Sequence, residues 1–164
     1  MKKLIPLVAF GGFLLAGALA CGSGDAGGGA AEVADDGSVK IPNSKQGFRA
    51  IVPEGTTPNG IGGAAGFHTD DDSFSMVVRE SSKQGRSKAD HKTEIESFAF
   101  GEWISEADLE DGYALAYVID LAGKKSNSVA VVRKIDGTDY ECTGSSTTPE
   151  GTAAIIDACK TVRK

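Results

Sequence analysis

The most regular hydrophobic pattern lies between Trp103 and Thr143, where apolar runs alternate with short turn signals. Asp111-Gly112 and Asp136-Gly137 are two-residue sequences typical of tight hairpins. A third turn is expected near Gly123, between these two. The region therefore predicts a four-stranded antiparallel meander.

Two strands of this meander are apolar on both faces. Tyr113 to Leu121 alternates large apolar residues with smaller ones, and Val129 to Val132 is apolar throughout. A strand that is apolar on both faces needs cover on both sides. We expect an α+β fold with an antiparallel sheet and helices on both faces.

Shorter β segments precede the meander. Residues 39–42 and 48–52 predict an opening hairpin, and 55–66 a loop rich in Gly, Thr and Pro. Gly66 to His68 and Phe74 to Glu80 then predict two further strands.

Two helices are predicted from capping residues. Ser87 with Asp90 predicts the start of a helix that runs to about Phe100. Thr148 followed by Pro149 predicts the second helix. The expected buried residues are Ala89, Ile95, Phe98 and Ala99 in the first helix, and Ala153, Ile156 and Cys159, with Ile155 and Val162 beside them, in the second.

The first twenty residues have the pattern of an export signal. Lys2 and Lys3 precede an apolar stretch, and Ala18-Leu19-Ala20 is a small-residue cleavage site. A retained transmembrane anchor is the competing interpretation, although the 17 residues from Leu4 to Ala20 are few for a membrane span.

Ala18-Leu19-Ala20-Cys21 resembles the lipobox of bacterial lipoproteins, with Ala in place of the commonest Leu at its first position. The resemblance implies that Cys21 is lipidated and becomes the N-terminus of an envelope protein. Because Gly22 rather than Asp follows, it favours the outer membrane, facing the periplasm or the surface, if the source has two membranes. Ordinary signal cleavage is the alternative and would leave Cys21 as a free thiol.

Cysteine number bears on this choice. The chain has three cysteines, and an odd thiol in an oxidising compartment needs an explanation. Lipidation of Cys21 would leave Cys142 and Cys159 as a pair, which we expect to join the last strand to the last helix. The alternative use of either cysteine, as a nucleophile with a histidine base, lacks any sign of a cleft.

The remaining chain divides into a tether and one domain. Residues 21–37 contain the lipid-bearing cysteine and a Gly-rich segment with too few apolar residues to fold alone. Residues 38–164 are enough for a single α/β domain. Without residues 1–20 the chain has 15 basic and 23 acidic residues, a net charge of −8. This balance argues against binding nucleic acid.

The residues from Phe48 to Gly55 follow the pattern F-x-x-x-V-P-x-G, which is similar to the opening of domains related to the photosystem PsbP protein. Asp136 to Cys142, followed by Ala153 to Arg163, resembles the closing segment of those domains. The resemblance covers about residues 39–164. It implies an α/β/α sandwich with a binding or assembly role and supplies no site residues.

No motif predicts a cofactor, metal ion or catalytic centre. Gly60 to Ala65 satisfies G-x-G-x-x-A but lacks the preceding strand and following helix of a dinucleotide site. The acidic runs at 70–72 and 106–111 do not match a calcium loop. His68 and His91 are not spaced as a ligand pair.

The remaining candidate is a basic stretch in an acidic protein, which we interpret as a docking patch for an envelope partner. The alternative is a solvated loop and helix surface. The sequence thus predicts a lipid-anchored, non-enzymatic binding or scaffolding module. A small-ligand module with residues 55–66 as its rim is the second hypothesis, and an envelope hydrolase the third. The basic stretch comprises Arg79, Lys83, Arg86, Lys88 and Lys92.

Overall fold

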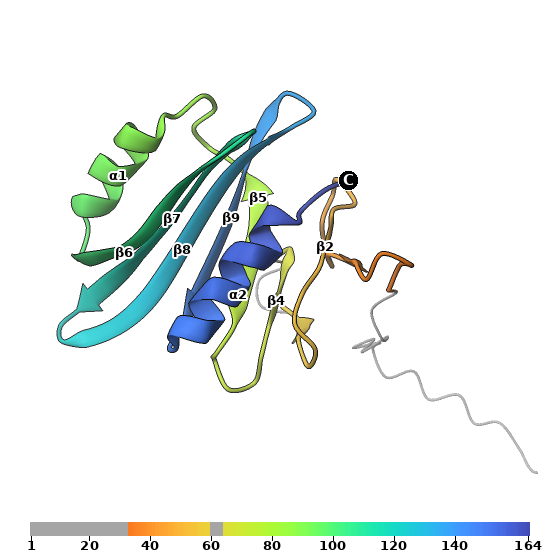
Figure 1. Ribbon diagram of the computed structural model, residues 1–164, viewed down its shortest axis with the longest axis horizontal. Helices are drawn as coiled ribbons and strands as arrows, with labels where there is room; N and C mark the ends of the chain where they lie inside the picture. Colours follow the sequence, from red (N-terminus) through yellow and green to blue (C-terminus); the bar gives the residue numbers. More distant parts are fainter. Residues whose placement is uncertain (1–32, 60–63) are drawn as a thin grey trace, which may run out of the picture. The chain divides into compact units, whose positions relative to one another are not determined.

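The computed structural model describes residues 33–59 and 64–164, so Cys21 and most of the predicted tether lie outside the described residues. Figure 1 shows an antiparallel sheet with two helices. The strands are β1 (Val39–Lys40), β2 (Arg49–Ala50), β3 (Thr57–Pro58), β4 (Gly66–His68), β5 (Ser75–Glu80), β6 (Phe100–Leu109), β7 (Gly112–Leu121), β8 (Lys124–Ile135) and β9 (Thr138–Ser146), and the helices are α1 (Lys88–Glu96) and α2 (Pro149–Lys160).

The predicted α+β class, opening hairpin and C-terminal meander are confirmed. β1 pairs with β2, and the other seven strands form one sheet in the order β3-β4-β5-β9-β8-β7-β6. The last four strands follow one another in the chain, whereas β5 pairs with β9 on the opposite side from β8. The chain must therefore pass from β5 to the far edge strand β6, and α1 lies in that connection.

Two glycines near the hairpin turns are required for different reasons. Asp136 and Gly137 have φ angles of 50° and 81°, the left-handed values that an Asp-Gly hairpin turn requires. Gly112 was predicted as a turn residue but is the first residue of β7. A side chain there would overlap the carbonyl group of Val132, so close approach of the backbones requires this Gly.

α2 begins as predicted and packs on one face of the sheet. The Thr148 hydroxyl accepts a hydrogen bond from the Gly151 N–H at 3.0 Å, with Pro149 in the first helical position. Of its predicted buried residues, Ile155, Cys159 and Val162 are buried, whereas Ala153 is exposed; Thr152 and Ala158 are buried in addition. Polar contacts hold Thr152 inward: its hydroxyl donates to the Thr148 carbonyl and accepts from the side chain of Asn127.

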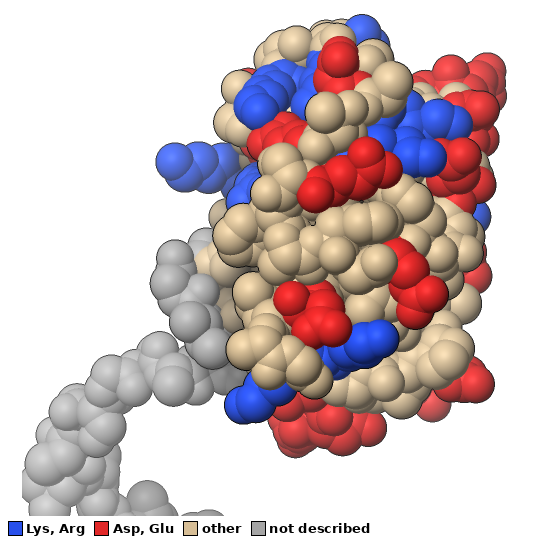
Figure 2. Space-filling model, turned by 90° about the vertical axis from the view of Figure 1, so that its left-hand side faces the viewer, with Lys and Arg blue, Asp and Glu red and all other residues tan. Residues whose placement is uncertain are grey.

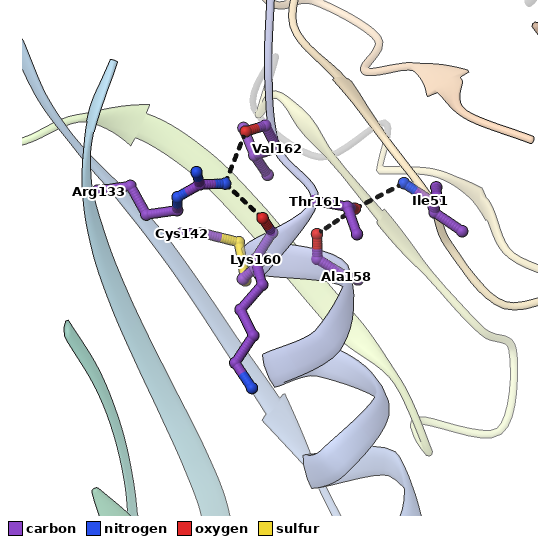
Figure 3. Close-up of a disulfide and its surroundings, with 8 residues drawn as sticks. Ile51, Arg133, Cys142, Ala158, Lys160, Thr161 and Val162 are labelled. Carbon is purple, nitrogen blue, oxygen red and sulfur yellow. Dashed lines mark hydrogen bonds between the residues drawn. A yellow bond between two sulfur atoms is a disulfide. The ribbon is translucent and has the colours of Figure 1, made fainter. Parts of the chain in front are cut away.

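A disulfide joins Cys142 of β9 to Cys159 of α2, with the two Cα atoms 5.6 Å apart (Figure 3). The predicted pairing is present in the structure. Arg133 of β8 adds to it by donating hydrogen bonds to the carbonyl groups of Lys160 and, at 3.0 Å, Val162. These contacts fix the end of α2 to the sheet on which the helix packs.

The chain termini of the domain also meet. Arg49 of β2 exchanges two backbone hydrogen bonds with Arg163, at 2.8 and 3.0 Å. Asp36 forms an ion pair with Arg163, and Val33 forms a β-bridge with Val39. Contacts with the folded domain therefore include residues from Val33 onward, within the segment predicted as tether.

α1 starts at the predicted cap but ends earlier than expected. The Ser87 hydroxyl accepts from the Asp90 N–H at 3.1 Å and donates to the Asp90 carboxylate at 2.7 Å. The helix ends at Glu96, because Ala99 turns the chain with a φ of 47° and Phe100 begins β6. The predicted apolar surface is wrong apart from Ile95, since Ala89 is exposed and Phe98 is 68% exposed.

The loop predicted over residues 55–66 is partly β structure. Thr57 and Pro58 form β3, which pairs antiparallel with β4. Residues 60–63, which include most of the G-x-G-x-x-A match, lie outside the described residues. Neither helix in the described part of the chain is long and apolar enough to cross a membrane.

Candidate functional site

The sheet carries a cluster of buried charged groups centred on Glu141 of β9. Its carboxylate lies 3.1 Å from the guanidinium of Arg86 and 3.1 Å from that of Arg79. The side chains of Glu141 and Arg86 are only 8% and 10% exposed, whereas that of Arg79 is 63% exposed. Glu141 thus links a buried cation in the loop before α1 to an exposed one on β5.

His91 of α1 completes this cluster. Its Nδ1 lies 3.1 Å from the hydroxyl of Tyr113, and its Nε2 lies 3.5 Å from the carboxylate of Glu141. Burial, together with the positive charge of Arg86, lowers the pKa of His91 from 6.5 to about 4. At neutral pH the ring is therefore uncharged, which suits a position between a phenol and a carboxylate that Arg86 already neutralises.

This cluster also explains how a helix without an apolar stripe packs on a sheet. Only His91 and Ile95 of α1 are buried. Ile95 belongs to a small apolar cluster with Tyr113, Leu115 and Val132. The rest of the attachment is polar, including a hydrogen bond of 2.9 Å from the Trp103 indole to Glu96.

The basic stretch is brought together, but each of its members pairs with an acid. Arg79 and Arg86 pair with Glu141, and Arg86 with Glu94 as well. Figure 2, which shows the side of Figure 1 that carries α1, has basic and acidic side chains interspersed over much of this surface. The lysine pairs are Lys83 with Glu94, Lys88 with Asp108, and Lys92 with Glu106, each with an N–O distance of 2.7 or 2.8 Å.

The second partner of Lys92 is the Trp103 ring, whose centroid lies 4.7 Å from the ammonium nitrogen. The side chain of Arg86 is buried against Glu141 and is therefore not available to a partner at the surface. Arg79 and Lys83, whose side chains are 63% and 56% exposed, are the members of the stretch most accessible to a partner. The patch is thus a mixed surface, not a concentration of unpaired positive charge.

A pocket of about 340 Å³ lies between α1 and the sheet. Its polar lining includes the Arg86–Glu141 pair and Arg79. Its apolar lining comes from α1, from a residue two positions after the helix, and from strands β7 and β8. Its apolar lining residues are Ile95, Phe98, Tyr117, Ile119 and Ala130.

The acidic runs do not assemble a metal site in the described residues, where no group of three or more metal-ligating side chains is found. Asp71 instead accepts hydrogen bonds from the hydroxyl and backbone N–H of Ser73, and these hold its pKa at about 2. Asp111 accepts hydrogen bonds from Arg133. The two histidines belong to different parts of the fold, since His68 is on β4 and His91 on α1.

Sequence reasoning missed Glu141 and treated His91 as isolated. One signal was present: Tyr140 and Cys142 face α2, so strand alternation places Glu141 on the other face. Its pairing with Arg86, 55 positions away in the chain, had no local signal.

The chain was also compared with known proteins. No protein-family model matches it, and no curated protein matches it either.

Proposed function

We propose that this chain is a bacterial lipoprotein, anchored in the cell envelope by lipid on Cys21, whose domain is a non-enzymatic binding or scaffolding module. The lipobox-like sequence before Cys21 supports the anchor. The Cys142–Cys159 disulfide supports it further, since it uses two of the three cysteines in the sequence and leaves Cys21 for lipid.

The pocket beside α1 is the observation that carries the binding role. It combines an apolar wall with charged groups that are already paired, so a ligand can bury apolar surface there without leaving a charge unpaired. Phe98 lines this pocket and is 68% exposed, so its ring is accessible to a molecule that binds there.

The same groups support a non-enzymatic role. A nucleophile needs a base within hydrogen-bond reach. Cys142 and Cys159 are joined to each other, so within the described residues neither thiol is free to act as a nucleophile with a histidine base. The proposal includes the PsbP-like α/β/α arrangement, supported by α1 and α2 contacting different apolar clusters of one sheet.

The docking patch predicted from the basic stretch remains part of this proposal in a narrower form. Arg79 and Lys83 are its accessible members, and Arg79 also lines the pocket. A partner that binds the pocket would therefore meet Arg79.

A second candidate is a small-ligand module bounded by residues 55–66. A hollow of about 650 Å³ includes Gly55 with Asp70, Thr148 and Gly151 in its lining, and this observation favours it. Residues 60–63 of that rim lie outside the described part of the chain.

Site-specific photo-crosslinking in the native membrane tests the proposal. A benzophenone amino acid in place of Phe98 should crosslink an envelope component, because it would stand at the rim of the pocket. The same amino acid in place of Asp157, an exposed residue of α2, should give little product. Crosslinking from Asp157 but not from Phe98 would contradict the assignment of the binding face.

A further inference from the structure

Four hydroxyl-bearing residues lie side by side across the sheet, on the face that carries the pocket. Ser75 of β5 pairs with Ser145 of β9, Ser145 with Ser128 of β8, and Ser128 with Tyr117 of β7. Neighbouring strands are about 4.8 Å apart, so this hydroxyl row is about 14 Å long.

The hydroxyl row lines a hollow of about 300 Å³, together with Val77 and Thr143. This hollow shares Tyr117 and Thr143 with the pocket beside α1. The two adjoin along one sheet face, so a single extended ligand can contact both.

The hydroxyl groups of the row have no hydrogen-bond partner among the described residues. This matters most for Ser128, which is only 8% exposed and lines the hollow. The rest of the residue is enclosed by protein, but its hydroxyl oxygen is not buried and stays open to the hollow. That hydroxyl can therefore form a hydrogen bond with a molecule bound there.

The chemistry of these groups defines the ligand. A hydroxyl both donates and accepts hydrogen bonds, so a matching ligand carries groups that do both. The charged groups nearby are paired with one another, so the site offers no excess charge to an anion or a cation. Val77 and the ring of Tyr117 add apolar surface to which the C–H face of a sugar ring is suited.

We propose that the hydroxyl row binds a short stretch of an uncharged carbohydrate chain, with Ser128 and Ser145 bonding its hydroxyl groups and Tyr117 supporting a sugar ring. The inference rests on the proposed binding role of this face and names the ligand class for it. Charged glycans are the other occupants that the experiment must separate.

Titration of the purified full-length protein in detergent tests the proposal, with maltotriose and an N-acetylglucosamine trimer as uncharged probes and trigalacturonate as a charged one. At least one uncharged trimer should bind. Ser128→Ala should weaken its binding about three- to tenfold, the usual effect of losing one neutral hydrogen bond, and Ser145→Ala should add a similar factor. Thermal unfolding of each variant verifies that the fold is intact.

Ser105→Ala is the matched control, because Ser105 is an exposed hydroxyl on β6 that lines neither hollow, and its variant should bind as wild type does. Three results would overturn the inference: no binding of either uncharged trimer, equal affinity of folded Ser128→Ala and wild type, or tighter binding of trigalacturonate. None of these results alters crosslinking from Phe98, so failure of the carbohydrate assignment is distinguishable from failure of the proposed function.

Discussion

Arg86 and Glu141 form an ion pair of 3.1 Å with both side chains about nine-tenths buried, although 55 positions separate them in the chain. The pair joins the loop before α1 to the last strand of the sheet. Removing one partner of a buried pair leaves the other charge without compensation, which costs about 3–5 kcal/mol.

Substitution of either partner should therefore destabilise the domain strongly. Arg86→Ala and Glu141→Ala should each lower the free energy of unfolding by about 3 kcal/mol or more. Arg79→Ala, which removes the exposed partner of the same carboxylate, should cost less than about 1 kcal/mol. Urea unfolding measures all three. Equal losses for Arg79→Ala and Arg86→Ala would show that burial does not decide the strength of these pairs.

Stability should also depend on pH through His91. In the folded state its pKa is about 4, below the ordinary 6.5, so the unfolded chain binds a proton first as the pH falls. The stability that His91 contributes is present above pH 6.5 and is lost as the pH falls toward about 4. Between pH 7 and pH 5 the loss should be about 2 kcal/mol.

The difference between wild type and His91→Gln isolates this contribution from the titration of the carboxylates. Unfolding free energies of both proteins at pH 7, 6 and 5 should converge as the pH falls. Thr93→Ala is the matched control, because Thr93 is an exposed residue of α1 without an ionisable group, and its curve should run parallel to that of wild type. Parallel curves for wild type and His91→Gln would refute the assignment.

The disulfide should stabilise the domain as well as link its last two elements. Cys142 and Cys159 are 17 positions apart, and closing a loop of this length contributes about 3 kcal/mol in the chain-entropy treatment. The double variant Cys142→Ala with Cys159→Ala should lose about that amount in urea unfolding. Alkylation of exported, denatured protein without reductant should label neither cysteine, and labelling of both would rule out the bond.

The sequence predicted those features of the fold that depend on residues adjacent in the chain. The Asp136-Gly137 turn and the Thr148 cap were predicted because a few adjacent residues determine each of them. The buried side of α2 was predicted through Ile155, Cys159 and Val162 but without Thr152, because hydrogen bonds with Thr148 and Asn127 hold Thr152 inward and hydrophobicity does not report them.

The candidate site was the least predictable part. α1 packs mainly through polar contacts, so a search for an apolar stripe selected Phe98, which is exposed, and passed over His91, which is buried. The basic stretch was visible in the sequence, but its acidic partners lie on α1, β6 and β9 and meet it only in the folded chain.

A non-enzymatic role predicts that polar groups outside the binding face can be replaced without loss of function. Asp71→Asn and His68→Ala should each support the cellular role in a deletion strain, since neither residue lines the pocket beside α1. A folded, membrane-bound variant of either residue that fails to complement would indicate chemistry at that residue.

The membrane anchor is the claim on which the rest of the account depends, and intact mass of the protein isolated from its own membranes tests it most directly. The account predicts a mature chain that begins at Cys21 and carries acyl groups, and a Cys21→Ser variant that leaves the membrane fraction. Cys142→Ser is the matched control and should stay in that fraction, because Cys142 lies within the folded domain. A wild-type mature protein without acyl mass at its N-terminus would contradict the account.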